Sequence, residues 1–116
     1  MPPPLITDDR WTITADKLRQ AVERIVELAA PQRVILFGSR ARGEQRPDSD
    51  ADLLVIEDEV TDQAAEMTRL RRALRSLRIP VDVLVVSGEK FRYWADTPGN
   101  VFYEAAHEGQ SLYEAA

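Results

Sequence analysis

The chain has 116 residues, a net charge of −5 and no cysteine, and 44% of its residues are apolar. This length supports one compact domain, and the composition is typical of a globular protein. The acidic balance argues against direct DNA binding. Having no cysteine and one histidine excludes a thiol nucleophile, a Cys-ligated zinc and a Ser-His-Asp triad, so any catalysis must use carboxylates, hydroxyls and arginines.

The two ends of the chain differ in character. Residues 1–13 include three consecutive prolines and are expected to form an extended N-terminal tail, whereas residues 14–116 are expected to form the folded domain. No apolar run approaches the roughly 20 residues of a membrane span, and the first residues lack the basic start and apolar core of a signal peptide. We therefore expect a cytoplasmic protein with no membrane segment.

Residues 14–56 predict a helix followed by two strands. Apolar residues recur at helical spacing after Thr14, a candidate N-cap, and the helix should end before Pro31. The apolar run from Val34 to Phe37 predicts a buried strand that ends at Gly38. Residues 40–49 are polar and include breakers, and a second apolar strand begins at Asp50. A polar loop should therefore join two core strands.

The rest of the chain predicts one βαβ unit and a helical end. A second amphipathic helix starts at Thr61 or Asp62 and stops before Pro80. Residues 81–86 are largely β-branched and should return parallel to the second strand by a right-handed crossover. Helix is expected again to about residue 95 and from residue 101 to Gly109. The fold class predicted is α/β: one domain with a small mixed sheet of at least three strands, flanked by helices.

Three aspartates fall at the starts of predicted strands. Side chains alternate along a strand, so Asp50 and Asp52 share a face, and the strand register can bring Asp82 beside Asp52. Such closely packed carboxylates repel one another unless a cation neutralises them, and Mg²⁺ prefers oxygen ligands. Paired metal ions can activate an attacking oxygen and stabilise a leaving phosphate. The pattern therefore predicts phosphoryl or nucleotidyl transfer at a Mg²⁺ site.

A candidate phosphate-binding turn lies just before the aspartates. Gly38 lets backbone N–H groups approach a phosphate, and the hydroxyl of Ser39 can add a hydrogen bond. Arg40 and Arg42 follow and can clamp phosphate oxygens, although an arginine in a polar loop can equally be solvated or paired with a surface acid. The combination of Gly-Ser, ten residues and Asp-X-Asp predicts a nucleotide site much better than any one of its parts.

This combination resembles the minimal nucleotidyltransferase (MNT) domain of the DNA polymerase beta superfamily. The resemblance lies in residues 38–43 and 49–54, and it extends to the strand that carries Asp82 and to the C-terminal residues 104–113. It implies a DNA polymerase beta-like fold in which Gly38 and Ser39 hold the triphosphate of ATP. It further implies that Asp50 and Asp52 ligate Mg²⁺, while Asp82 completes the metal site and helps deprotonate the acceptor hydroxyl.

The same resemblance implies a protein partner. Many stand-alone proteins of this family are antitoxins that transfer AMP from ATP to a tyrosine of a HEPN ribonuclease toxin. The toxin's own Arg-X(4 to 6)-His signature is absent here, because the only histidine, His107, has no arginine four to seven residues before it. The alternatives are an antitoxin that acts by binding alone, and a nucleotidyltransferase acting on a small molecule or a nucleic-acid end. The oligomeric state stays open.

A further cluster of charge has two interpretations. Five arginines on the second predicted helix form either a solvated face or a surface for an acidic partner: Arg69, Arg71, Arg72, Arg75 and Arg78. We interpret His107, Trp11 and Trp94 as packing or surface residues, because no partner residues for chemistry accompany them.

Overall fold

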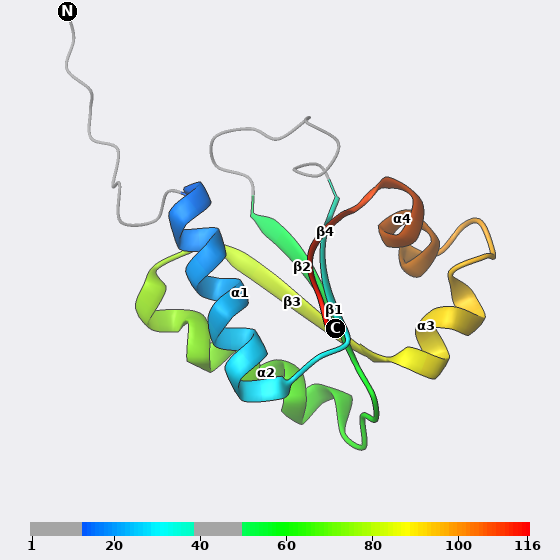
Figure 1. The fold of residues 1–116 in the computed structure, drawn as a ribbon, viewed down its shortest axis with the longest axis horizontal. Helices are drawn as coiled ribbons and strands as arrows, with labels where there is room; N and C mark the ends of the chain where they lie inside the picture. The colour runs from blue at the N-terminus through cyan, green and yellow to red at the C-terminus, as the bar shows by residue number, and fades with distance from the viewer. Residues whose placement is uncertain (1–12, 39–49) are drawn as a thin grey trace, which may run out of the picture.

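The computed structural model describes residues 13–38 and 50–116, which form helices on both sides of a sheet (Figure 1). In chain order they are α1 (Ala15–Ala29), β1 (Arg33–Phe37), β2 (Ala51–Glu57), α2 (Gln63–Leu74), a 3-10 turn (Arg75–Leu77), β3 (Val81–Ser87), α3 (Gly88–Trp94), α4 (Val101–Glu108) and β4 (Gln110–Glu114). The helices and the first three strands confirm the predicted elements. β4 was not predicted, because a five-residue strand directly after a helix carries little periodicity of its own.

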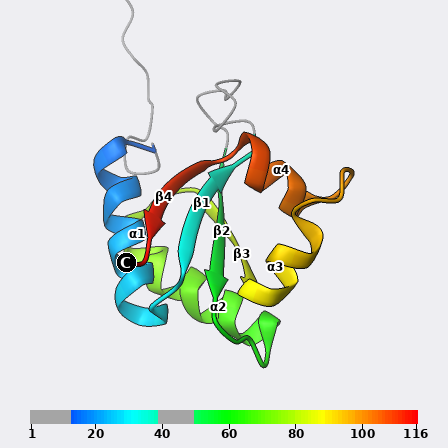
Figure 2. The same cartoon turned by 45° about the vertical axis from the view of Figure 1, so that its right-hand side comes forward.

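The four strands form one mixed sheet in the order β3-β2-β1-β4. β1 pairs antiparallel with both β2 and β4, whereas β2 and β3 run parallel, as expected for strands joined through a helix. α1 and α2 cover one face of this sheet, and α3 and α4 lie on the other (Figures 1 and 2). The predicted small mixed sheet flanked by helices is confirmed.

Alternating side chains of β2 supply both halves of the core. Ala51, Leu53 and Val55 pack in the cluster that includes buried residues of α1 and α2. Leu54 and Ile56 pack in the second cluster with residues of α3 and α4. All five are essentially inaccessible to solvent, and burial of one such aliphatic side chain contributes about 1.5 to 3 kcal/mol. This two-sided burial fixes the register of β2 and therefore the position of the residues at its two ends.

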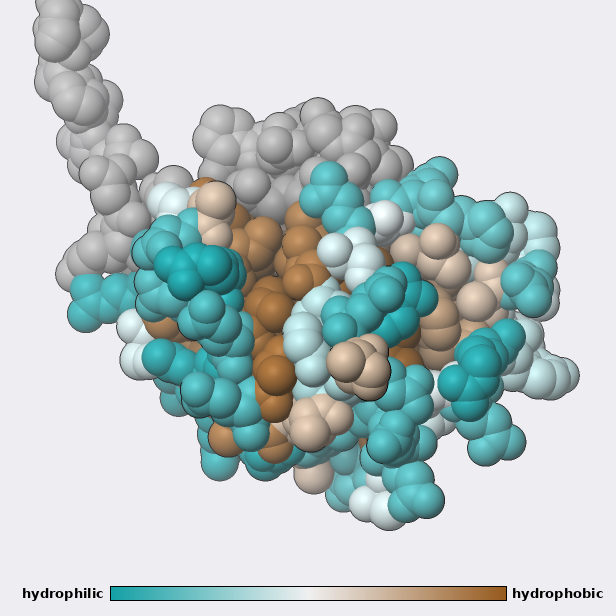
Figure 3. All heavy atoms as spheres, viewed as in Figure 1, coloured by the Kyte–Doolittle hydropathy of each residue, from teal (hydrophilic) through white to brown (hydrophobic). Residues whose placement is uncertain are grey.

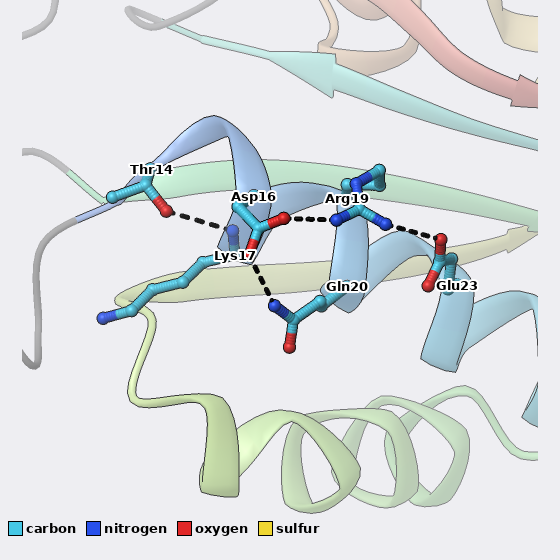
Figure 4. Close-up of polar contacts among 6 residues, drawn as sticks. All are labelled: Thr14, Asp16, Lys17, Arg19, Gln20 and Glu23. Atoms are coloured by element: carbon cyan, nitrogen blue, oxygen red, sulfur yellow. Dashed lines mark hydrogen bonds and ion pairs between the residues drawn. The ribbon is translucent and has the colours of Figure 1, made fainter.

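The helix ends have the caps that the sequence suggests. The Thr14 hydroxyl accepts a hydrogen bond from the Lys17 amide, and Asp62 accepts one from the Ala65 amide at the start of α2. Along the exposed side of α1, Asp16 and Glu23 both pair with Arg19, one turn away in each direction (Figure 4). α2 ends at Leu74, earlier than predicted, because the last residues before Pro80 tighten into the 3-10 turn. None of the described helices is long and apolar enough to cross a membrane.

Candidate active site

The strand register brings the predicted site residues to one end of the sheet. Asp52 lies directly opposite Asp82 in the parallel pairing of β2 and β3, and opposite Phe37 in the antiparallel pairing of β1 and β2. Gly38 follows Phe37, so it borders the same point. We call this the aspartate end of β2. The predicted neighbourhood of Asp52 and Asp82 is confirmed, whereas Ser39, Arg40 and Arg42 lie outside the described residues.

Gly38 is a position where a side chain does not fit. Its φ of +80° lies in the left-handed region, which glycine adopts without a steric penalty. A Cβ atom at this position would lie 2.6 Å from the Asp52 Oδ2 atom, far inside van der Waals contact. The chain can therefore turn out of β1 beside the Asp52 carboxylate only because residue 38 is glycine. This close approach leaves the backbone of the turn next to a carboxylate oxygen.

Asp52 is half-buried and faces several other acids. Burial raises the pKa of Asp52, and the negative charges of Asp82, Asp50 and Glu104 raise it further, in that order of size. Glu104 comes from α4. Its place near the aspartates was not predicted, since a glutamate in a surface helix carries no distinctive signal. Carboxylates from β3, α4 and the segment before β2 thus raise the pKa of the Asp52 carboxyl on β2.

Asp82 has a cationic partner that the sequence did not reveal. The Arg71 Nη2 atom of α2 donates to Asp82 Oδ1 at 2.6 Å and to the Val83 carbonyl oxygen at 3.1 Å. Asp82 Oδ1 also accepts the Val83 amide at 3.0 Å. Arg71 was grouped with the other arginines of α2 as a solvated or partner-binding face, but it reaches instead to the outer strand of the sheet.

The chemistry of these side chains fits a divalent cation, although they are not gathered around one point. Asp50, Asp52 and Asp82 offer carboxylate oxygens, the ligands that Mg²⁺ prefers, and their mutual repulsion favours a cation between them. Within the described ranges, no three His, Asp or Glu side chains are close enough together to hold a metal ion. For Asp82, the physical reason for this separation is its contact with Arg71, which orients the carboxylate toward α2.

A second acidic group lies at the far end of the same strand. Glu57 is 9% exposed, and its Oε2 atom has no hydrogen-bond partner in the described part of the chain. Burial, followed by a hydrogen bond with the Glu66 carboxyl, raises the pKa of Glu57 to about 8. Arg69 binds Glu66 through two nitrogen atoms at 2.8 Å and lowers the pKa of that carboxyl. We call this group the glutamate end of β2.

Comparison with known proteins gives the family. The family model described as a nucleotidyltransferase domain matches residues 15–106, which is most of the chain. The chain therefore belongs to the nucleotidyltransferase domain family. No curated protein sequence matches the chain significantly.

Two solved structures share the fold. A Sulfolobus solfataricus protein assigned as a nucleotidyltransferase is 20% identical with a TM-score of 0.62, and the alignment covers 85% of this chain and 78% of that one. A toxin-antitoxin structure solved with AMP-PNP is also 20% identical with a TM-score of 0.57, covering 84% and 73%. At this identity the likeness shows the nucleotidyltransferase fold alone.

Proposed function

We propose that this protein is a Mg²⁺-dependent nucleotidyltransferase that transfers AMP from ATP to a hydroxyl group. The observation that carries the proposal is that Asp52 lies directly opposite Asp82 and against Gly38 at one end of the sheet, with Asp50 two residues before Asp52. Membership of the nucleotidyltransferase domain family supports the reaction class. When bound by the three aspartates, Mg²⁺ supplies charge neutralisation for the triphosphate and for the leaving pyrophosphate.

The protein's own groups position and deprotonate the reactants. The turn at Gly38 lets backbone amides approach the triphosphate, and Ser39, Arg40 and Arg42 are proposed to contact its oxygens. The acceptor oxygen forms a bond to the α-phosphorus as the bond to pyrophosphate breaks, in line with the attack. Asp82 is proposed to accept the proton of the acceptor hydroxyl. No covalent intermediate with the enzyme is required.

The proposed acceptor is a tyrosine of a HEPN ribonuclease toxin, which makes this protein its antitoxin. One observation supports a protein substrate: a protein of the same fold occurs in a toxin-antitoxin structure with a nucleotide analogue. We propose the cytoplasm as the place where both proteins meet.

The direct test is the intact mass of a candidate HEPN toxin, measured after incubation with this protein, ATP and Mg²⁺. We expect a gain of one or more AMP units with the native protein and none with Asp50→Asn/Asp52→Asn. The matched control is Asp58→Asn/Glu59→Gln, which removes two exposed negative charges near the other end of β2. An unchanged mass with native protein, although ATP and Mg²⁺ are bound, would contradict protein adenylylation.

A second candidate, neutralisation by binding alone, is favoured by one observation. Apolar side chains, mostly only partly buried, reach the surface in a strip between α1 and β4 (Figure 3), where they line a groove of about 680 Å³. The apolar residues of this groove include Leu18, Val22, Val26, Leu112 and Tyr113. Exposed apolar grooves are typical of protein-binding surfaces. If binding suffices, Asp50→Asn/Asp52→Asn will still neutralise the toxin, whereas a catalytic antitoxin will lose this ability.

A further inference from the structure

Arg71 lies where α2 passes the outer strand of the sheet. β3 is an edge strand, so the Val83 carbonyl oxygen is free of a strand partner on that side and accepts from Arg71. This contact anchors the guanidinium group next to the start of β3. From there Arg71 also reaches Asp82, the second residue of β3.

One oxygen of the Asp82 carboxylate is already occupied by donors of the chain. Oδ1 receives the Arg71 guanidinium at 2.6 Å and the Val83 amide at 3.0 Å. Asp82 and Asp52 are register partners, yet the Arg71 contact draws one carboxylate toward α2 while the other faces Gly38. The positive charge of Arg71 therefore opposes a second cation at Asp82, and a cation that takes Oδ1 must displace Arg71.

We propose that Arg71 is a positioning residue that competes with the divalent cation for Asp82. This inference rests on the proposed function: the cation gains full use of the Asp82 carboxylate only when Arg71 releases Oδ1. The exchange is energetically accessible because both side chains are largely exposed, Arg71 by 44% and Asp82 by 61%. Exposed ion pairs are weak. The Val83 carbonyl keeps Arg71 in place during the exchange, so the contact can form again.

The test measures Mn²⁺ binding to the purified full chain without nucleotide, by electron paramagnetic resonance of the free ion. We expect Arg71→Gln to bind Mn²⁺ about threefold to fivefold more tightly than the native protein, which is the upper part of the range for loss of an exposed ion pair. Arg71→Lys keeps the charge and should stay close to the native affinity. Arg72→Gln makes the same change of charge on the same helix without touching Asp82, and it should change the affinity less than about twofold.

Each outcome decides the proposal. Native or weaker affinity in Arg71→Gln, with native binding abolished by Asp52→Asn, would overturn the competition while leaving the metal site intact. An equal gain in Arg72→Gln would also overturn it, because general electrostatics would then explain the effect. Absence of Mn²⁺ binding in both native protein and Arg71→Gln would refute the metal site and this inference together. Circular dichroism of each variant verifies that the fold is retained.

Discussion

The two ends of β2 both gather acidic side chains, but they neutralise them differently. At the glutamate end, Glu57 is buried and shares a hydrogen bond with Glu66, whose charge Arg69 balances from one helical turn away. At the aspartate end, Asp52 faces acids that arrive from other elements, and Arg71 forms its ion pair with Asp82. At the glutamate end, residues of the chain itself therefore neutralise the acidic side chains.

This difference separates a structural acid from a candidate active site. A raised pKa alone does not distinguish them, since Glu57 and Asp52 are both shifted upward and burial is the largest cause for each. The distinguishing features are the convergence of several acids and the turn at Gly38, which brings backbone close to a carboxylate. Substitutions at each end of β2 test whether the two ends differ in this way.

The largest expected effect on stability is at the glutamate end. The folded protein holds the Glu57 proton with a pKa of about 8, whereas the unfolded chain releases it near 4.5. The stabilisation is therefore complete below about pH 4.5 and is lost as the pH rises toward 8. Glu57→Gln mimics the protonated acid and should be more stable than native protein at pH 8.5 by about 2 kcal/mol, because Glu66 shares the effect.

Urea unfolding at pH 5 and pH 8.5 measures this change. At pH 5 the two proteins should be nearly equal in free energy of unfolding, and Glu59→Gln, an exposed neighbour, should follow the native protein at both values. If the free energy of unfolding of Glu57→Gln depends on pH as that of the native protein does, Glu57 does not hold a proton in the folded state. The charge of Glu57 would then not be neutralised in the way proposed.

At the aspartate end, Gly38→Ala should cost stability and function together. The left-handed backbone costs an alanine about 1 kcal/mol, and its Cβ atom must displace the Asp52 carboxylate. We expect unfolding at a lower urea concentration and weaker binding of Mg²⁺ with nucleotide. Gly99→Ala is the matched control: φ is +96° there, but a Cβ meets no atom within 4 Å. Equal loss of nucleotide binding in Gly38→Ala and Gly99→Ala would show that the closeness of Gly38 to the Asp52 carboxylate does not matter for binding.

The smallest expected effect is on the titration of Asp52. Asp82→Asn and Glu104→Gln should both lower the pKa of Asp52, and Asp82→Asn should lower it more, because the Asp82 charge is the larger cause. Carboxyl carbon chemical shifts in NMR titrations report this pKa directly. A larger shift in Glu104→Gln would mean that α4, and not β3, supplies the main acidic neighbour.

The sequence predicts most of the fold and half of the candidate site. The unbroken apolar run of β2 and the helical spacing in α1 are strong signals, and the run in β2 is unbroken because helices bury both faces of the sheet. The pairing of Asp52 with Asp82 follows from strand alternation and a parallel connection. β4 was missed because its side chains are exposed or only partly buried, which leaves no apolar pattern to detect.

The unpredicted residues of the site are those placed by tertiary packing. Arg71 is one of five similar arginines, and only the packing of α2 beside β3 shows that this one reaches Asp82. Glu104 is brought toward Asp52 by the position of α4 over the sheet. In the sequence, Glu57 is simply the polar residue at the end of an apolar strand. Its raised pKa depends on burial in the folded protein, which no local sequence pattern indicates.

Whether the aspartate end of β2 binds a nucleotide with Mg²⁺ is tested most directly by calorimetric titration with AMP-PNP in the presence and absence of Mg²⁺. We predict that native protein binds the nucleotide in a Mg²⁺-dependent manner. Asp50→Asn/Asp52→Asn should lose more than about tenfold in affinity. Asp58→Asn/Glu59→Gln, with the same charge change near the glutamate end, should bind as the native protein does. Native affinity in the aspartate variant, or an equal loss in the control, would contradict the assignment of the nucleotide site to the aspartate end of β2.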